Sequence, residues 1–333
     1  MKVHIASESI FITKGTGVHT AFLEHIELMK EKNDLEVVVN GEGFGDVFHC
    51  HTYGPYYFWK GWRYKGRRIH TVHVIPESIK GSLPNWKILM PFVKWYFKLV
   101  YSYADVCIAI SPMVEQCIKD LGAHTRIVKI YNPVLIDKWR RTDEMRIIGR
   151  EMLGLSENDF VVLGVGQLQE RKGIEDFIDI SESVPEAKFI WAGGRPFGKL
   201  TEGIARIDAR IANAGHIKFT GLVGLNEMKY IYAAADLLLF PSFQENCPLA
   251  PLEAAACGMP VIFRDIEEFA VLYENTYLKA NTTQEFIDLT KRLIHDKSFY
   301  EKGLQISEKM IKQFDKNIIS DKLIKLYRDL CQN

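Results

Sequence analysis

Short runs rich in apolar residues alternate with longer amphipathic stretches along the 333-residue chain. The first half contains such runs at 3–6, 37–39, 47–49, 105–111 and 127–131, and the second half contains them at 160–164, 188–194, 217–221 and 236–240. Each run has the length of a buried strand, and the stretches between them can form helices, such as one expected over 18–32. Alternation of this kind predicts an α/β fold with parallel sheets and crossover helices.

A polar stretch at 137–159, which contains a short predicted helix, interrupts this pattern before the strands resume at Phe160. A chain of this length can form two domains of ordinary size, so we expect one domain over residues 1–150 and a second over 151–314. From about Tyr300 the tail is an amphipathic helix, with Lys and Glu on one side and Ile, Leu and Met on the other.

Two glutamates stand eight residues apart in Phe240-Pro-Ser-Phe-Gln-Glu-Asn-Cys-Pro-Leu-Ala-Pro-Leu-Glu-Ala-Ala-Ala-Cys-Gly-Met-Pro-Val261. The segment predicts a strand end, a loop, a helix and a further strand. Glu245 falls in the loop, Pro248 suits the first helical turn, and Glu253 is expected about two turns along the helix. A carboxylate beside the N–H groups of a helix start can bind sugar hydroxyls and phosphate together. A solvated loop glutamate and a surface helix glutamate are the alternative.

This segment resembles the signature of glycosyltransferase family 4, whose members are retaining enzymes that use nucleotide sugars. The signature has two glutamates separated by seven residues, then a helix of small residues, a glycine and a Pro-Val pair. The matching residues are Glu245, Glu253, Gly258, Pro260 and Val261. The resemblance implies the GT-B fold, in which two Rossmann-like domains carry parallel sheets that face each other across a cleft. It also implies that the last helix, over about 315–333, crosses back to the N-terminal domain.

The segment Gly166-Gln-Leu-Gln-Glu-Arg-Lys-Gly173 lies between a predicted strand and a predicted helix. Two cations beside a helix N-terminus would suit a diphosphate and neutralise charge as the leaving group departs, although a charged surface turn is the alternative. The family's Gly-Arg…Lys-Gly element, which binds the donor diphosphate, occupies this place. Lys172 aligns with its lysine, whereas Gln167 replaces its arginine, which leaves Arg171 as a candidate substitute.

The resemblance implies that Glu245 holds the donor hexose and that Glu253 takes the ribose hydroxyls. It implies that the residues after Glu245 also bind the donor; these are Asn246, Cys247, Pro248 and Leu249. Closure of the two domains around the donor is expected. Electrostatic stabilisation of the departing nucleotide should be the largest catalytic contribution.

The first half supplies two further candidates. His73 matches the family histidine that contacts the donor sugar, with His49 and His51 as nearby alternatives, and a structural histidine is the competing interpretation. Gly17, in Gly15-Thr-Gly17, resembles the family's glycine loop near the donor phosphate or acceptor. The candidate catalytic residues are His73, Glu245 and Lys172, and no covalent nucleophile is assigned.

We expect no metal or other cofactor. The chain has no Asp-x-Asp pair, which metal-dependent glycosyltransferases of the other major fold use to hold a divalent cation. The six cysteines form no close CxxC pair, so the sequence indicates neither a zinc site nor a disulfide framework. No apolar run reaches the length of a membrane span, and the first residues lack a signal-peptide profile, so we expect a cytoplasmic location with reduced thiols.

Net charge is zero overall but uneven along the chain, because residues 47–104 hold nine Lys/Arg and one acid. The same region is rich in Trp, Tyr and Phe, and Lys87, Lys94 and Lys98 share one stripe of a predicted helix. This profile is typical of a helix in a membrane interface. A buried crossover helix with outward-reaching lysines and a nucleic-acid site are the alternatives, of which we disfavour nucleic acid. The candidate membrane or acceptor residues are Trp59, Lys60, Trp62, Arg63, Arg67, Arg68, Lys87, Lys94, Trp95 and Lys98.

A finer resemblance, carried by residues 165–173 and 189–198, is to the bacterial branch that extends glycosyl-diacylglycerols. It implies transfer of a hexose, with glucose favoured, from a UDP-sugar to a glycolipid such as monoglycosyl-diacylglycerol, with an α-linkage. The enzyme would be peripheral on the inner face of the cell membrane. The alternatives are a soluble or polysaccharide acceptor, a non-catalytic sugar-nucleotide-binding protein, and a nicotinamide-dependent oxidoreductase; the incomplete glycine fingerprint disfavours the last.

Overall fold

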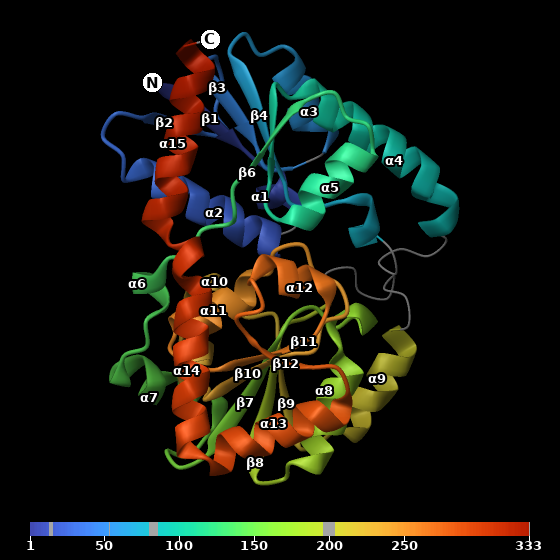
Figure 1. Ribbon diagram of the computed structural model, residues 1–333, viewed down its shortest axis with the longest axis vertical. Helices are drawn as coiled ribbons and strands as arrows, with labels where there is room; N and C mark the ends of the chain where they lie inside the picture. Colours follow the sequence, from blue (N-terminus) through green and yellow to red (C-terminus); the bar gives the residue numbers. More distant parts are fainter. Residues whose placement is uncertain (13–15, 53, 80–85, 196–203, 333) are drawn as a thin grey trace. The chain divides into compact units, whose positions relative to one another are not determined.

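A computed structural model describes residues 1–12, 16–52, 54–79, 86–195 and 204–332. The chain forms two compact units (Figure 1). The first unit combines the N-terminal part as far as Val134 with the C-terminal part from Phe314, and the second unit holds Leu135–Gln313. The domain boundary expected at residue 150 therefore lies within a helix of the second unit, at Asp143–Leu153.

The first unit contains a six-stranded sheet in the order β2-β1-β3-β4-β5-β6, in which every paired strand is parallel. The strands are β1 (Lys2–Ala6), β2 (Glu36–Val39), β3 (Val47–Cys50), β4 (Arg67–Val72), β5 (Val106–Ala109) and β6 (Arg126–Lys129). The helices are α1 (Ser9–Ile12), α2 (Gly17–Lys30), α3 (Pro55–Trp62), η1 (Pro76–Ile79), α4 (Trp86–Tyr103), α5 (Pro112–Asp120) and α15 (Lys316–Gln332). All five predicted strands are present, while α2 ends two residues before the predicted Lys32.

Alternation along the strands separates two apolar layers in this unit. Val47 joins the larger cluster, to which α2 and α15 also contribute, whereas Phe48 and Cys50 join a smaller cluster with Tyr57 of α3. The last helix thus packs against the first sheet, and Figure 1 shows α15 alongside α2. Helix α3 packs against α4, because the hydroxyl of Tyr103 donates to the carbonyl of Gly61 at 2.7 Å.

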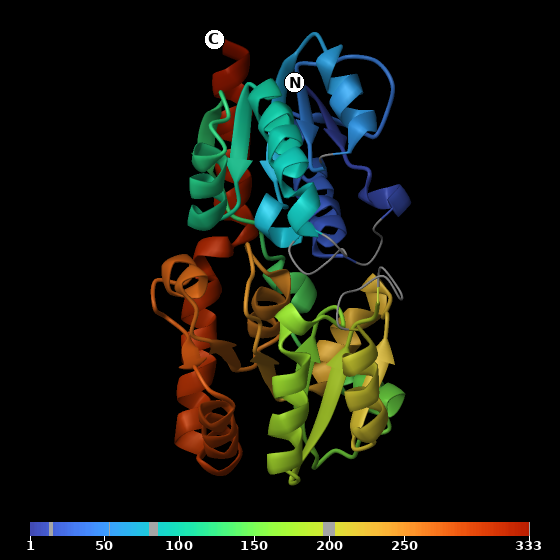
Figure 2. The same cartoon turned by 90° about the vertical axis from the view of Figure 1, so that its right-hand side faces the viewer.

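The second unit contains a six-stranded parallel sheet in the order β12-β11-β10-β7-β8-β9. Figure 2 shows this unit in green, yellow and orange. The strands are β7 (Phe160–Val165), β8 (Ala187–Ala192), β9 (Ile217–Gly221), β10 (Leu237–Phe240), β11 (Val261–Arg264) and β12 (Leu278–Ala280). The helices are α6 (Ile136–Trp139), α7 (Asp143–Leu153), η2 (Glu170–Lys172), α8 (Ile174–Ser183), α9 (Ile204–Asn213), α10 (Leu225–Ala234), α11 (Leu249–Ala256), α12 (Glu267–Leu272), α13 (Thr283–His295), α14 (Lys297–Ile311) and η4 (Lys312–Phe314), which reaches into the first unit. The four strands predicted from apolar runs and the further strand predicted at Val261 are all present, whereas β12 was not predicted.

No helix in the described part of the chain has both the length and the apolar character needed to cross a bilayer.

One carboxylate, that of Asp236, holds α7 against the strands of the second unit. Asp236 forms ion pairs with Arg146 at 2.7 Å and Arg150 at 2.9 Å, and it accepts from the amide of Val161 at 2.9 Å. Arg150 is almost fully buried, and this burial lowers the pKa of its guanidinium. Removing the carboxylate would leave a buried cation without its counter-ion.

We therefore expect Asp236→Ala to lower the free energy of unfolding by about 3 kcal/mol. The matched control is Asp143→Ala, at the exposed start of α7, which should cost no more than about 1 kcal/mol. Denaturant unfolding of both variants measures the difference, and equal losses would contradict the anchoring role of Asp236.

Candidate active site

The candidate residues of the second unit gather where two neighbouring strands end. Strands β7 and β10 pair in parallel, so the loops that follow them, at 166–173 and 241–248, leave the sheet at the same edge. The strand order runs from β7 to β8 and β9 on one side, and from β10 to β11 and β12 on the other. Such a switch point is where parallel α/β sheets bind their ligands.

Glycines let these two loops approach each other closely. Gly173 has φ +71°, and a Cβ atom there would lie 2.3 Å from the carbonyl oxygen of Pro241. The amide of Phe243 donates to the carbonyl of Arg171 at 2.8 Å, which joins the loops directly. At the other end of the first loop, the indole of Trp191 donates to the carbonyl of Gly166 at 2.9 Å. The backbone that carries Lys172 is therefore held on both sides.

A buried ion pair links the two loops. The ammonium of Lys172 donates to Oε1 of Glu245, and their side chains are only 13% and 8% exposed. Burial lowers the pKa of Lys172, while the charge of Glu245 opposes this shift. The guanidinium of Arg171 lies 4.0 Å from the same carboxylate and donates to the carbonyl of Gln244 at 3.4 Å. Two cations thus face one carboxylate, which leaves positive charge available for an anionic ligand.

The second glutamate occupies a separate buried position. Glu253 is the fifth residue of α11, about one turn along it, so the expected two turns are wrong. Pro248 is the N-cap residue and does not belong to the first turn. The hydroxyl of Tyr232 donates to Oε2 of Glu253 at 2.6 Å. Burial raises the pKa of Glu253 to about 7, while this hydrogen bond and the charge of Lys138 act in the opposite direction.

The start of α11 supplies backbone donors beside these glutamates. Pro248 has no side chain that can cap the helix, so the first amides of α11 are suited to an external acceptor. Cys247 and Leu249 are buried, and Asn246 accepts from the side chain of Gln244 at 3.3 Å. Gln167, which replaces the family arginine, is half-buried in the loop after β7.

Three residues outside the candidate set support the site, and of these only Arg264, which follows the Pro-Val strand, also contributes to the finer family resemblance. Tyr232 reaches Glu253 from α10, twenty-one residues away along the chain. Arg264 donates to the carbonyl of Pro241 at 2.9 Å and pairs with Asp176 at 2.7 Å, so it fastens the loop that carries Glu245. The amide group of Gln169 is buried without a partner in the described part of the chain, and a polar ligand could satisfy it.

In the first unit, His73 is buried just beyond β4, and its Nε2 lies 2.9 Å from Nδ1 of His51. Burial lowers the pKa of His73 to about 3, so its ring is neutral near pH 7. Gly17 is the first residue of α2, whose N-cap is Thr16, whereas Gly15 lies outside the described residues.

Most of the candidate membrane residues lie on exposed parts of α3 and α4. Trp59, Trp62 and Trp95 are 52%, 58% and 58% exposed. The lysines of the predicted stripe, together with Arg63 and Arg67, are also exposed; they are Lys87, Lys94 and Lys98. Helix α4 connects the parallel strands β4 and β5 and buries Phe97 and Val100. Ile88, Phe92 and Trp95 nevertheless face solvent, which a fully buried crossover helix does not explain.

Two of these cations are held by the protein itself. Arg68 forms an ion pair with Asp105 at 2.7 Å and lies over the ring of Tyr103 at 4.4 Å. Asp105 balances its charge, so Arg68 has a structural role, and its contact with a membrane stays a prediction. Lys60 is half-buried and donates to the carbonyl of Gly41.

Comparisons with known proteins agree with this architecture. The family described as "Glycosyl transferases group 1" matches residues 159–296, and "Glycosyltransferase Family 4" matches residues 45–138. An alpha-galactosylglucosyldiacylglycerol synthase of Streptococcus pneumoniae is 35% identical over 286 residues, which cover 83% of this chain and 76% of that protein. A processive diacylglycerol alpha-glucosyltransferase of Acholeplasma laidlawii is 27% identical over 300 residues, which cover 89% of each.

Solved structures show the same fold. HepE of Anabaena, in complex with UDP and glucose, has a TM-score of 0.77 at 19% identity and covers 99% of this chain and 100% of its own. A sucrose-phosphate synthase of Thermosynechococcus elongatus has a TM-score of 0.78 at 17% identity, with 99% of both chains covered. The two parallel six-stranded sheets and these likenesses define the GT-B fold. The chain belongs to glycosyltransferase family 4, and it is an enzyme that transfers a sugar.

The raised pKa of Glu253 makes the stability of the fold depend on pH. The folded chain keeps a proton that the unfolded chain releases, so stability falls as the pH rises from about 4.5 to about 7. Glu253→Gln removes this titration and keeps an acceptor for Tyr232. The free energy of unfolding of the variant minus that of the wild type should therefore be about 2 to 3 kcal/mol larger at pH 8 than at pH 5. Denaturant unfolding at both pH values measures the gain, and parallel curves would contradict the shift.

Proposed function

We propose that this enzyme transfers a hexose, with glucose favoured, from a UDP-sugar to a glycosyl-diacylglycerol, with retention of the anomeric configuration. The two relatives support a glycolipid acceptor, since one is named a glycosyldiacylglycerol synthase and the other a diacylglycerol glucosyltransferase. The complex of HepE with UDP and glucose supports a UDP-sugar donor for this fold.

The observation that carries the proposal is the pairing of Lys172 with Glu245 beside Arg171. A diphosphate that enters this site supplies the anion that the two cations lack, and Lys172 then turns from Glu245 to the phosphate. Glu245 and the residues that begin α11 become available for the hydroxyls of the donor hexose. Charge that develops on the departing UDP is stabilised by groups already in position.

Glu253 is the proposed ligand of the ribose. The hydroxyl of Tyr232 occupies one carboxylate oxygen, so the other oxygen can accept hydrogen bonds from the ribose hydroxyls. These bonds favour the ionised carboxylate. In the first unit, His73 is the proposed contact of the donor sugar, as the resemblance to family 4 implies.

We further propose that the reaction needs no metal. The cations of the loop after β7 and the amides at the start of α11 perform the role that a divalent ion has in other glycosyltransferases. This view is supported by the absence of an Asp-x-Asp pair from the sequence.

The proposed acceptor surface consists of the exposed aromatic residues and cations on α3 and α4. Aromatic rings such as Trp59 and Trp95 enter the boundary between headgroups and acyl chains, and lysines such as Lys94 and Lys98 attract anionic headgroups. The enzyme would then act as a peripheral protein on the cytoplasmic leaflet, where its lipid acceptor resides.

Transfer from UDP-glucose to monoglucosyl-diacylglycerol in vesicles tests the proposed reaction, with mass analysis of the glycolipid. We expect Lys172→Ala to lower kcat by about 100-fold or more, because the leaving group loses a positioned cation. The variant should stay folded, as judged by circular dichroism, but with a lower free energy of unfolding, because Glu245 then has only Arg171 as a nearby cation. The matched control is Lys188→Ala, an exposed lysine of β8, which should keep wild-type turnover.

Wild-type turnover in Lys172→Ala would count against the diphosphate site. Loss of transfer in EDTA, with recovery in magnesium, would refute the metal-free reaction. Transfer to a soluble sugar but not to the glycolipid would replace the proposed acceptor.

Co-sedimentation with vesicles tests the surface of α3 and α4. Each basic residue near an anionic leaflet contributes about 1 kcal/mol, so Lys94→Gln with Lys98→Gln should weaken binding by about 30-fold. The control combines Lys30→Gln with Lys129→Gln, which makes the same charge change at exposed positions of α2 and β6. Equal weakening by both pairs would show a nonspecific effect of net charge, and equal binding to neutral vesicles would exclude the electrostatic contribution.

A further inference from the structure

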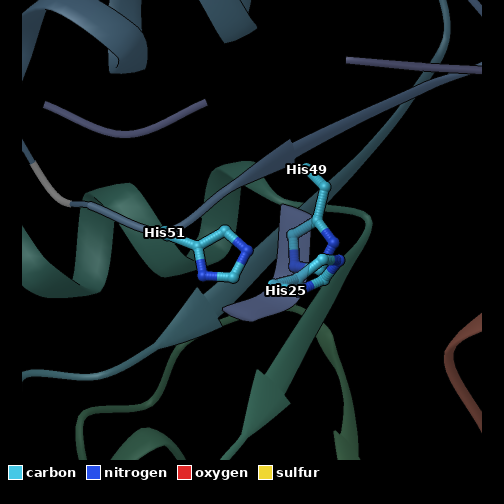
Figure 3. A group of neighbouring side chains, drawn as sticks. All are labelled: His25, His49 and His51. Carbon is cyan, nitrogen blue, oxygen red and sulfur yellow. The ribbon is translucent and has the colours of Figure 1, made fainter. Parts of the chain in front are cut away.

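One face of the first sheet carries a buried group of polar side chains. Because side chains alternate along a strand, His49 and His51 at the end of β3 point to the same face as Thr71 and His73 of the neighbouring β4 region. Helix α2 covers this face with His25, and α15 covers it with Tyr327. Figure 3 shows the rings of His25, His49 and His51 gathered there.

Hydrogen bonds account for two of these rings. The hydroxyl of Tyr327 lies 2.9 Å from Nε2 of His25 and 2.6 Å from Nδ1 of His49. It can donate to one of these nitrogens while it accepts an N–H bond from the other. The second nitrogen of His49 lies 2.6 Å from the hydroxyl of Thr71. Burial lowers the pKa of His25 to about 3 and that of His49 well below its ordinary value, so both rings are neutral.

A metal ion is the other occupant that three clustered histidines can hold. Nitrogen atoms of His25, His49 and His51 all lie within 4.8 Å of one another. However, the hydroxyl of Tyr327 already bonds to nitrogens of His25 and His49. An ion would have to displace this hydroxyl, and so we regard the cluster as a hydrogen-bonded frame.

The frame immobilises His51. The ring of His49 stacks on it at 4.7 Å, and the rings of His25 and Phe22 meet it edge to face at 4.6 Å and 5.6 Å. On its other side, His51 stacks on His73 at 5.2 Å, and Nδ1 of His51 lies 2.9 Å from Nε2 of His73. Nε2 of His51 is buried and has no partner in the described part of the chain.

The position of the proton follows from this environment. Two neutral imidazoles share one hydrogen bond, so the proton belongs either to His51 Nδ1 or to His73 Nε2. If His73 donated, the N–H of His51 would lie at its buried Nε2 without an acceptor. Buried N–H groups without a partner are rarer in proteins than buried acceptors without one. The geometry therefore favours donation from His51 Nδ1, which places the N–H of His73 at its Nδ1.

We propose that His51 is a positioning residue that fixes the ring orientation of His73 and holds the proton of His73 at Nδ1. The consequence for sugar transfer rests on the proposed function, in which His73 contacts the donor. The proton of His73 itself can be measured without any substrate.

Nuclear magnetic resonance of histidine labelled with ¹⁵N and ¹³C reports the tautomer of each ring, and His73→Phe identifies the signal of His73. We expect the Nδ1–H form in the wild type, loss of this single form in His51→Phe, and its recovery in His51→Asn, whose side-chain amide can replace the Nδ1 donor. Tyr327→Phe is the matched control. It removes a hydroxyl from the same frame and should lower stability while His73 keeps its tautomer.

An Nδ1–H signal that persists in His51→Phe, or an Nε2–H signal in the wild type, would overturn the proposal. In a further experiment, zinc is added to the protein at micromolar concentration and the histidine signals are recorded again. Uptake of one equivalent that shifts the His25, His49 and His51 signals would replace the hydrogen-bonded frame by a metal centre, and would also overturn it.

Transfer kinetics separate positioning from the function itself. We expect His51→Phe to lower kcat by about tenfold with little change in KM for the lipid, and His51→Asn to recover most of this loss. His51→Phe should add little to the loss in His73→Phe, because both variants remove the same contact. Additive losses would contradict positioning. If the wild type has the expected tautomer but transfers no sugar, the proposed function fails and the positioning of His73 stands.

Discussion

The buried ion pair between Lys172 and Glu245 is the interaction on which the site of the second unit depends. It joins loops from two neighbouring strands, and these loops can meet because Gly173 has no side chain to collide with Pro241. Replacing either residue would leave the other as a poorly compensated buried charge, which lowers the free energy of unfolding. Arg171 adds a cation that Glu245 does not fully balance. The protein thus keeps a small excess of positive charge in a partly dry place, which is the condition for holding a leaving diphosphate.

The fold could be predicted from the sequence because buried parallel strands are short and apolar. Nine runs gave nine strands, and the connecting stretches gave helices between them. Helix ends were less certain, because they depend on capping rather than on periodicity. The start of α11 shows this: Pro248 suits a first helical turn, yet it is the N-cap residue, so the helix begins one residue later.

The sequence predicted the site residues that lie in short motifs, but it did not predict the residues that reach the site from distant elements. Lys172 and Glu245 belong to short segments whose residue order is informative, and the structure brings them together. Tyr232 and Asp176 come from other helices, and no local pattern indicates which side chain they meet. Arg68 shows the same limit in the first unit. Its counter-ion, Asp105, lies just beyond the basic segment, so charge counted along the chain overstated the charge on the surface.

The connectivity of the first unit has a consequence for the order of folding. One of its apolar clusters needs Ile319, Leu323 and Tyr327 of α15, which the ribosome synthesises only after the whole second unit. The six strands of the first sheet therefore leave the ribosome early, but one face of this sheet stays partly uncovered until α15 has been synthesised. Meanwhile the second unit is continuous in sequence and can fold as soon as it leaves the ribosome. Until α15 arrives, the open face of the first sheet is the part of the nascent chain most in need of a chaperone.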